Sequence, residues 1–249
     1  MKPLVITTSW DDGHALDMKL AELLHRYGLT GTFYISKDYQ QPRLTDAQIK
    51  ELVQTFEVGA HTITHRELTT LAPDVARAEI MDSKHWLEQI IGRLVSSFCY
   101  PRGDYNSAVR DMVKIAGFSL ARTVEAFKLS YQDPFEMGTT LHVYPFPMRM
   151  RNAHCPKFYG GIFGFQINRF RAMRDFGVPF TQRWSWLSTA KAMFDIAQTK
   201  GGIFHLWGHS WEIEKYGLWP DLEKFFEYLK NKGIRCITNQ NTVTSEINY

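Results

Sequence analysis

Residues 4–14 of the chain read Leu-Val-Ile-Thr-Thr-Ser-Trp-Asp-Asp-Gly-His, a short β-branched run that leads into two adjacent carboxylates and a glycine. The run at 4–8 has the length and composition of a buried β-strand. Alone, Asp11-Asp12-Gly13 is a turn signal more often than a site. The prediction of the fold therefore depends on whether this pattern, a strand followed by polar residues, recurs along the chain.

Short apolar runs do recur, and they alternate with longer stretches of helical period. This alternation is typical of parallel βαβ units in one α/β domain. Thr45 and Gln48 have the spacing of a capping box that begins a helix, and Pro73 begins another. The eight predicted strands span residues 4–8, 31–35, 57–60, 97–100, 118–123, 139–144, 202–207 and 234–238. Their number and order favour a (β/α) barrel over an open doubly wound sheet.

Length and composition set further limits. A chain of 249 residues suits one barrel, and we expect a single domain over residues 1–249. The 44% hydrophobic and 22% charged residues are the proportions of a soluble globular protein. The 29 Lys and Arg against 26 Asp and Glu give a net charge of +3, too small for a dedicated nucleic-acid binder. We therefore expect no nucleic-acid partner.

The sequence also predicts a cytoplasmic location. No apolar run approaches the roughly 18 to 20 residues that a transmembrane segment needs. The first residues turn polar and acidic within about ten positions and lack the apolar centre of a secretory signal. The three cysteines, Cys99, Cys155 and Cys236, are widely spaced without a Cys-x-x-Cys pair, so we expect reduced thiols.

One basic stretch interrupts the alternation of strands and helices. Residues 145–184 hold seven arginines and lysines against the single acid Asp175, and this stretch is predicted to be an insertion. Two interpretations stay open. The stretch forms either a solvated basic surface or a lid that recognises an anionic substrate such as a sugar phosphate.

Two histidines follow the third predicted strand. His61 and His65 lie four residues apart, and a helical turn would place both rings on one face within reach of a shared metal ion. The pair differs from the His-Glu-x-x-His motif of zinc proteases, because Thr62 stands where that motif has its glutamate base. A catalytic base must come from elsewhere in the chain.

Polar residues also follow the fourth and seventh predicted strands, where the catalytic residues of α/β barrels lie. The fourth strand leads into Tyr100-Pro101-Arg102-Gly103, and the seventh contains His205 and leads to His209. The even separation of these two histidines would place both on one face of a strand. One of them could instead be a hydrogen-bonded core residue.

Taken together, these positions resemble the polysaccharide deacetylases, the NodB-homology or carbohydrate esterase family 4 enzymes, from Thr8 to Glu212. The specific parts are Asp11-Asp12-Gly13 after a first strand and His61-Thr62-x-x-His65 after a third. The resemblance implies a distorted (β/α) barrel of seven or eight strands. It also implies a divalent metal, usually zinc, and hydrolysis of an acyl group from a carbohydrate or sugar conjugate.

The resemblance also implies residue roles. Asp11 matches the general base and His209 the general acid, while Asp12, His61 and His65 match the metal ligands. One carboxylate and two neutral imidazoles leave zinc open positions for water and substrate. We further expect the substrate to contact five residues near these groups, namely Tyr100, Arg102, Arg122, Trp207 and Trp211.

Two departures from the family pattern matter. The family places an arginine early in the fourth-strand motif, where it holds the base carboxylate, but this chain has Cys99 at that position. Arg102 is shifted by alignment and Arg122 is a possible substitute, so the partner of Asp11 stays open. The family's Asp-Trp pair in its fourth motif is also not evident in Arg122-Thr123-Val124-Glu125.

The seventh-strand motif departs as well. The family reads Leu-x-Leu-x-His there, with leucines around the acyl methyl group, whereas this chain reads His205-x-Trp207-x-His209. Trp207 would make the acyl pocket smaller, so we predict acetyl or formyl and nothing longer. Trp207 could also be plain core packing. Sugar stacking and burial both remain open for Trp10, Trp207, Trp211 and Trp219, and Glu212 could orient His209 through a hydrogen bond.

Three functions are consistent with these features. The leading prediction is a cytoplasmic metal-dependent hydrolase that removes a short N-acyl group from a sugar or sugar conjugate. The second is a hydrolase of cyclic imides, ureides or other non-peptide C–N bonds on the same barrel, which the missing export signal favours and the three metal ligands oppose. The third is a non-catalytic carbohydrate-binding barrel that retains a structural metal.

Overall fold

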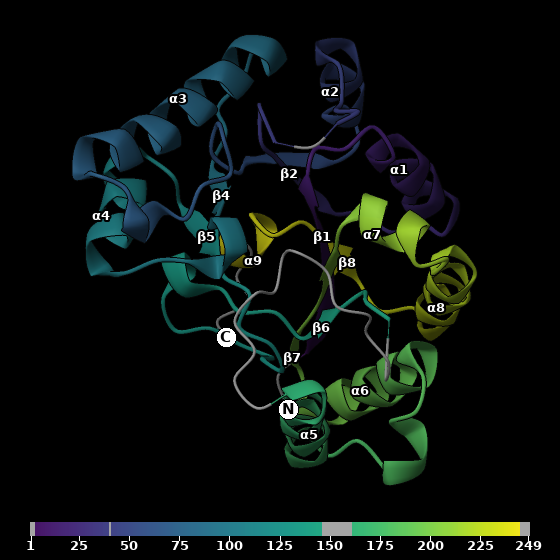
Figure 1. Cartoon of the computed structure of the whole chain (residues 1–249). Helices are drawn as coiled ribbons and strands as arrows, with labels where there is room; N and C mark the ends of the chain where they lie inside the picture. The colour runs from purple at the N-terminus through teal and green to yellow at the C-terminus, as the bar shows by residue number, and fades with distance from the viewer. Residues whose placement is uncertain (1–2, 40, 146–160, 245–249) are drawn as a thin grey trace.

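The structure is a computed structural model, and it describes residues 3–39, 41–145 and 161–244. Strands and helices alternate along most of the chain, with the helices on the outside of a parallel sheet (Figure 1). The strands are β1 (Leu4–Asp12), β2 (Thr32–Ile35), β3 (Glu57–Ala60), β4 (Ser97–Cys99), β5 (Leu120–Arg122), β6 (Leu141–His142), β7 (Gly202–Gly208) and β8 (Cys236–Ile237). The helices are α1 (Asp17–Arg26), α2 (Asp46–Leu52), α3 (Pro73–Ile91), α4 (Ser107–Ile115), α5 (Gly161–Phe176), α6 (Trp186–Lys200), α7 (Ser210–Lys215), α8 (Trp219–Lys232) and α9 (Asn241–Thr244).

β1 lies at the centre of the sheet, whose strand order is β5-β4-β3-β2-β1-β7-β6. One side of β1 pairs with β7 from Leu4 to Trp10. On its other side, Ile6 and Thr7 pair with β8, and the positions from Ser9 onward pair with β2. β1 is therefore held on both sides along most of its length, and its last residues are fixed in position.

The segment between β5 and β6 bridges the two edges of this sheet. The backbone N–H of Met137 donates to the carbonyl of Ala121 at 3.0 Å, and Thr123 N–H donates to the carbonyl of Met137 at 2.8 Å. Three residues later, Thr140 N–H donates to the carbonyl of His205 in β7 at 2.9 Å. The predicted α/β barrel of seven or eight strands is confirmed, and its curvature brings β5 close to β1.

The core forms where the apolar faces of the helices meet the sheet. The capping box of Thr45 and Gln48 is present at the start of α2, and α3 begins at Pro73 as predicted. In α8 the apolar residues recur at helical spacing and are fully buried, and each such side chain contributes roughly 1.5 to 3 kcal/mol of burial free energy. These residues are Leu222, Phe225, Phe226 and Leu229.

Every predicted strand is present, but some of the predicted ends were wrong. β1 was expected to end at Thr8 and continues to Asp12, because Asp11 and Asp12 stay in register with Tyr34 and Ile35 of β2. The two carboxylates therefore lie on the strand itself. β6 has only two residues, since the chain before it pairs with β5 and then β7 rather than with one neighbour.

The basic stretch at 145–184 is only partly described. Residues 146–160 lie outside the described residues, as does Cys155, while Gly161–Phe176 form α5. Cys99 and Cys236 are free thiols. No helix in the described ranges has the length and apolar character needed to cross a bilayer. The assignment of the whole chain to one domain stays a prediction.

Candidate active site

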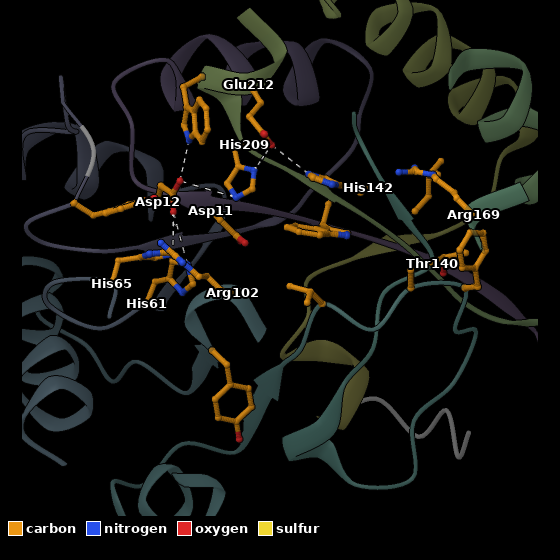
Figure 2. Close-up of a pocket in the computed structure, with 18 of the residues that line it drawn as sticks. Asp11, Asp12, His61, His65, Arg102, Thr140, His142, Arg169, His209 and Glu212 are labelled. Carbon is orange, nitrogen blue, oxygen red and sulfur yellow. Dashed lines mark hydrogen bonds and ion pairs between the residues drawn. The ribbon is translucent and has the colours of Figure 1, made fainter. Parts of the chain in front are cut away.

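A cavity of about 510 Å³ opens at the carboxyl ends of the strands, and Figure 2 shows the side chains that point into it. This is the end of an α/β barrel where active sites lie. All of the predicted site residues except Arg122 line the cavity. They are Asp11, Asp12, His61, His65, Tyr100, Arg102, Trp207, His209 and Trp211.

Asp12, His61 and His65 converge at one end of the cavity. Asp12 Oδ1 lies 3.7 Å from His61 Nε2 and 3.5 Å from His65 Nε2, and the three ligand atoms lie within 4.8 Å of one another. Among the described residues, Asp12 Oδ1 is buried without a hydrogen-bond partner. A buried oxygen without a partner costs free energy unless a ligand supplies one. One carboxylate and two imidazoles at these spacings fit a divalent metal such as zinc.

The tautomer of His61 also fits a metal ligand. His61 Nδ1 lies 2.8 Å from the backbone carbonyl of Cys99, which can only accept a hydrogen bond. Nδ1 therefore carries the proton, and the lone pair of Nε2 is directed toward Asp12. Burial lowers the pKa of both histidines, that of His65 to about 2, so both rings are neutral at neutral pH.

The two histidines lie on an irregular loop, so the predicted helical turn was wrong. Thr62 and His65 have φ values of 64° and 56°, which a right-handed helix does not contain. The loop is held by Glu79 of α3. Its carboxylate accepts from the backbone N–H groups of Ile63 and Thr64, each at 2.9 Å. This anchor replaces the helical hydrogen bonds and still brings the two rings to 4.6 Å between centroids.

The turn after β1 explains the Asp-Asp-Gly sequence. Asp12 has a φ of 85° and Gly13 a φ of 72°, and a Cβ on Gly13 would lie 2.6 Å from Ile35 Cγ2. Only glycine fits there without displacing β2. The positive φ of Asp12 is a strained conformation of the kind that clusters at functional sites. Trp211 Nε1 donates to the second oxygen of Asp12 at 2.8 Å and fixes the carboxylate.

Asp11 and Arg122 form a buried ion pair, which identifies the partner that the sequence left open. Arg122 Nη2 donates to both carboxylate oxygens, and neither side chain is more than 3% exposed. Burial by itself would raise the pKa of Asp11. The charge of Arg122, with that of His209, outweighs it and lowers this pKa to about 2. Asp11 is therefore ionised at neutral pH.

Arg102 does not take part in this pair. It has a φ of 56°, lines the cavity wall, and donates to Glu67 at 3.0 Å on the surface. The Sγ of Cys99 lies 3.9 Å from Asp11 Oδ2, close to where the family's arginine would act. Tyr100 lines the cavity, while its hydroxyl donates to the carbonyl of Phe135 at 3.1 Å.

His209 lies just past β7 and is held by Glu212, as the sequence allowed. Its Nδ1 is 2.6 Å from Glu212 Oε2, and its Nε2 is 3.9 Å from Asp12 Oδ2. Because Nδ1 donates to Glu212, Nε2 is the atom that faces Asp12. Burial lowers the pKa of His209, but the charge of Asp12 and the hydrogen bond of Glu212 outweigh this and raise it to about 9.

His205 is the core histidine of the pair. Its Nε2 lies 2.8 Å from Ser9 Oγ and its Nδ1 lies 3.2 Å from the carbonyl of Gly138. Both ring nitrogens are therefore engaged inside the barrel, and the ring is 1% exposed. The even spacing from His209 does not make it a site residue, because β7 ends at Gly208 and His209 begins a new direction of the chain.

The sequence missed His142, which lies on β6 opposite Trp207. The two rings stack with centroids 3.9 Å apart, and His142 Nε2 is 3.4 Å from Glu212 Oε2. Nothing local signals this role, because His142 sits in an ordinary strand and acquires its partners from β7 and α7. Tyr39, which stacks on His65 with centroids 3.9 Å apart, was missed for the same reason.

Known proteins resemble this chain in sequence and in fold. Residues 1–121 match the family model for polysaccharide deacetylases, and this range contains Asp11, Asp12, His61 and His65. A Mycobacterium smegmatis structure assigned to the polysaccharide deacetylases is 14% identical, covers 99% of this chain and 90% of its own, and has a TM-score of 0.66. The resemblance to the polysaccharide deacetylases is confirmed.

Two further solved structures are similar. A family 4 acetyl xylan esterase from Clostridium thermocellum, solved with a cobalt ion, is 15% identical over 96% of this chain and 90% of its own, with a TM-score of 0.59. The Streptococcus pyogenes deacetylase PplD, solved with acetate, is 24% identical over 47% of this chain, with a TM-score of 0.46, and the chain spans 55% of its length. No curated protein matches the chain.

The tryptophans that the sequence singled out differ in whether they line the cavity. Trp207 lines the cavity, its ring stacks on that of His142, and the guanidinium carbon of Arg122 lies 4.7 Å from its centroid. Trp10 is fully buried and donates to Thr8 Oγ1 at 3.1 Å, so it is a core residue. Trp219 is not part of the cavity wall and donates to Glu214 at 2.5 Å.

Proposed function

We propose that the protein is a metal-dependent hydrolase that removes a short N-acyl group, acetyl or formyl, from a sugar or sugar conjugate in the cytoplasm. The observation that carries this proposal is the arrangement of five side chains around one end of the cavity. Asp12, His61 and His65 form a ligand set, and Asp11 and His209 flank it.

The ligand set supports zinc as the metal. It offers two neutral imidazole nitrogens and one carboxylate oxygen, which leaves positions open for water and substrate. A divalent metal held there would lower the pKa of a bound water to about 7 and polarise an acyl oxygen. The cobalt ion in the Clostridium thermocellum esterase agrees with a divalent site of this kind.

The two flanking groups are suited to opposite proton transfers. Asp11 is ionised and fixed by Arg122, so it can accept a proton from the attacking water. His209 is charged at neutral pH and presents Nε2 to the metal ligands, so it can donate a proton to the departing amine. Glu212 keeps Nδ1 of His209 engaged, and the proton is therefore given from Nε2.

Trp207 supports a small acyl group. Its indole replaces a leucine of the family pattern, stacks on the ring of His142 and lies close to the guanidinium of Arg122. These contacts restrain the ring from rotating aside to admit a longer chain. The relatives include an acetyl xylan esterase, so an ester of the same acyl group is the alternative bond that the test must include.

The test begins with the metal content of the purified protein by mass spectrometry, followed by release of acetate or formate from a panel of N-acylated sugars, nucleotide sugars, acetylated xylan and cyclic imides. We expect about one divalent metal per chain and turnover of the N-acyl sugars. His61→Ala should empty the site, while His209→Ala should retain metal and lower kcat by about 10²- to 10⁴-fold. Activity on imides by metal-free protein would contradict the proposal.

A further inference from the structure

The cavity extends well beyond the metal ligands. Figure 2 shows His61 and His65 at one end and Thr140 and Arg169 at the other, with His142 between them. The volume of about 510 Å³ lies within the roughly 300 to 1,000 Å³ of pockets that enclose small-molecule ligands. An acetyl or formyl group at the metal end therefore leaves the other end for the rest of the substrate.

Arg169 of α5 is the cationic residue at this far end. It lines the cavity together with Asn168 of the same helix, and its guanidinium carbon lies 5.7 Å from the centroid of the Tyr144 ring. A neighbouring arginine of α5 has a different position. Arg174 is exposed, pairs with Asp175 at 2.8 Å, and does not line the cavity. Among the described side chains of α5, Arg169 is the basic residue that lines the cavity.

The acidic residues of the cavity wall all have partners near the metal end. Asp11 pairs with Arg122, Asp12 faces two histidines and Trp211, and Glu212 accepts from His209. A divalent metal would add further positive charge to this end. Among the described residues that line the cavity, these three are the acidic ones.

The charge of Arg169 acts on His142, a residue inside the cavity. Burial has the largest effect on His142, and the charges of His209 and Arg169 add to it, so the pKa of His142 falls to about 4. The imidazole is therefore neutral at neutral pH. Arg169 contributes positive charge to the wall that an entering ligand meets.

We propose that Arg169 binds an oxyanion, phosphate or carboxylate, that the sugar carries away from its N-acyl group, so that the substrates are anionic N-acylated sugars. This proposal rests on the proposed function for the reaction at the metal end. A guanidinium binds such groups through two parallel N–H donors, which gives both attraction and orientation. The side-chain amide of Asn168 offers a further donor in the same wall.

The test compares substrates that differ in the oxyanion. The zinc-loaded full chain is assayed on N-acetylglucosamine, N-acetylglucosamine 1-phosphate and N-acetylmuramic acid. We expect kcat/KM to be about 10- to 100-fold higher for an anionic sugar than for the neutral one, the range of a charged hydrogen bond. The comparison of phosphate with carboxylate identifies the group that Arg169 prefers. Equal kcat/KM for all three sugars would overturn the proposal.

Two variants assign the preference to Arg169. Arg169→Gln should reduce the preference for anionic sugars by about 10-fold or more, and Arg169→Lys should keep part of it because the charge remains. Arg174→Gln is the matched control, since it removes the same charge from the same helix outside the cavity, and it should keep the full preference. A preference that survives in Arg169→Gln would contradict the assignment.

A binding measurement separates this proposal from the proposed function. Calorimetric titration with glucosamine 1-phosphate and glucosamine needs no turnover. If no sugar is deacylated but Arg169→Gln, unlike Arg174→Gln, weakens binding of glucosamine 1-phosphate about 10-fold, the reaction fails and the anion site stands. If deacylation occurs but both variants bind glucosamine 1-phosphate equally, the anion site is wrong and the reaction stands.

Discussion

Glu212 Oε2 lies 2.6 Å from Nδ1 of His209, three residues earlier in the chain. This contact joins the residue at the start of α7 to an acid within the same short helix. Ser210, between them, donates to the buried carboxylate of Asp17 at 2.5 Å and ties α7 to α1. The orientation of His209 is therefore set by the first turn of α7.

Glu212→Gln should lower kcat and change the pH profile. The wild-type pKa of His209 is raised by the charge of Asp12 and by Glu212, against the effect of burial. A general acid must be protonated, so kcat falls as the pH rises through this pKa. Without the carboxylate charge the pKa drops, and we expect the basic limb of the kcat profile to move to lower pH, with metal content retained. An unshifted basic limb would argue against this role of Glu212.

His142→Phe should lower kcat by about 2- to 10-fold, because it removes a weak polar contact with Glu212. The phenyl ring preserves the stacking on Trp207 but removes Nε2, which lies 3.4 Å from Glu212 Oε2. KM and thermal stability should change little, because the packing is kept. His142→Gln restores a donor and should recover part of the rate. Equal kcat in all three proteins would show that His142 has no part in positioning Glu212.

Arg122→Met should destabilise the protein by about 3 to 5 kcal/mol, because it leaves the carboxylate of Asp11 buried without its cation. The wild-type pKa of Asp11 is lowered from 3.8 to about 2, so its contribution to stability is present above pH 3.8 and is lost as the pH falls through about 2. The deficit of the variant should therefore shrink in acid. Urea denaturation between about pH 2 and pH 7 measures the free energy of unfolding of both proteins across this range. The double variant Arg122→Met with Asp11→Asn should recover part of the loss.

Trp207→Leu should broaden the range of acyl groups. The leucine returns this position to the family pattern and opens space beside His142. We expect the wild type to hydrolyse acetyl derivatives much faster than propionyl and butyryl derivatives, and the variant to narrow this difference by about 10-fold, the effect of one or two methylenes in a pocket. Equal wild-type rates on the three derivatives would exclude a size limit at Trp207.

Local sequence pattern predicted the strands and helices well. The β-branched runs located every strand, and Thr45 with Gln48 located the start of α2, because these features depend on neighbours along the chain. The ends of β1 and β6 were wrong because pairing with β2, β5 and β7 decides them. The convergence of Asp12, His61 and His65 could be expected from the parallel order of the strands, but the loop conformation could not, since Glu79 in α3 imposes it.

Contacts across the barrel could not be deduced from spacing. Arg122 reaches Asp11 over 111 positions because the sheet curves and brings β5 toward β1. The sequence indicated Arg102 and Arg122 as possible partners of Asp11 and did not distinguish between them. His142 gave no signal, because alternation along β6 indicates which face a residue takes and leaves the neighbours on β7 and α7 unknown.

The attachment of residues 61–65 to Glu79 has a consequence for how metals exchange. The carboxylate of Glu79 satisfies two backbone amides of the loop that carries both histidines, and this contact needs no cation. We therefore expect removal of a metal by a chelator to leave the loop and the barrel folded. Two imidazoles and one carboxylate bind several first-row divalent ions, so we expect the ion at the proposed site to depend on which metals are available.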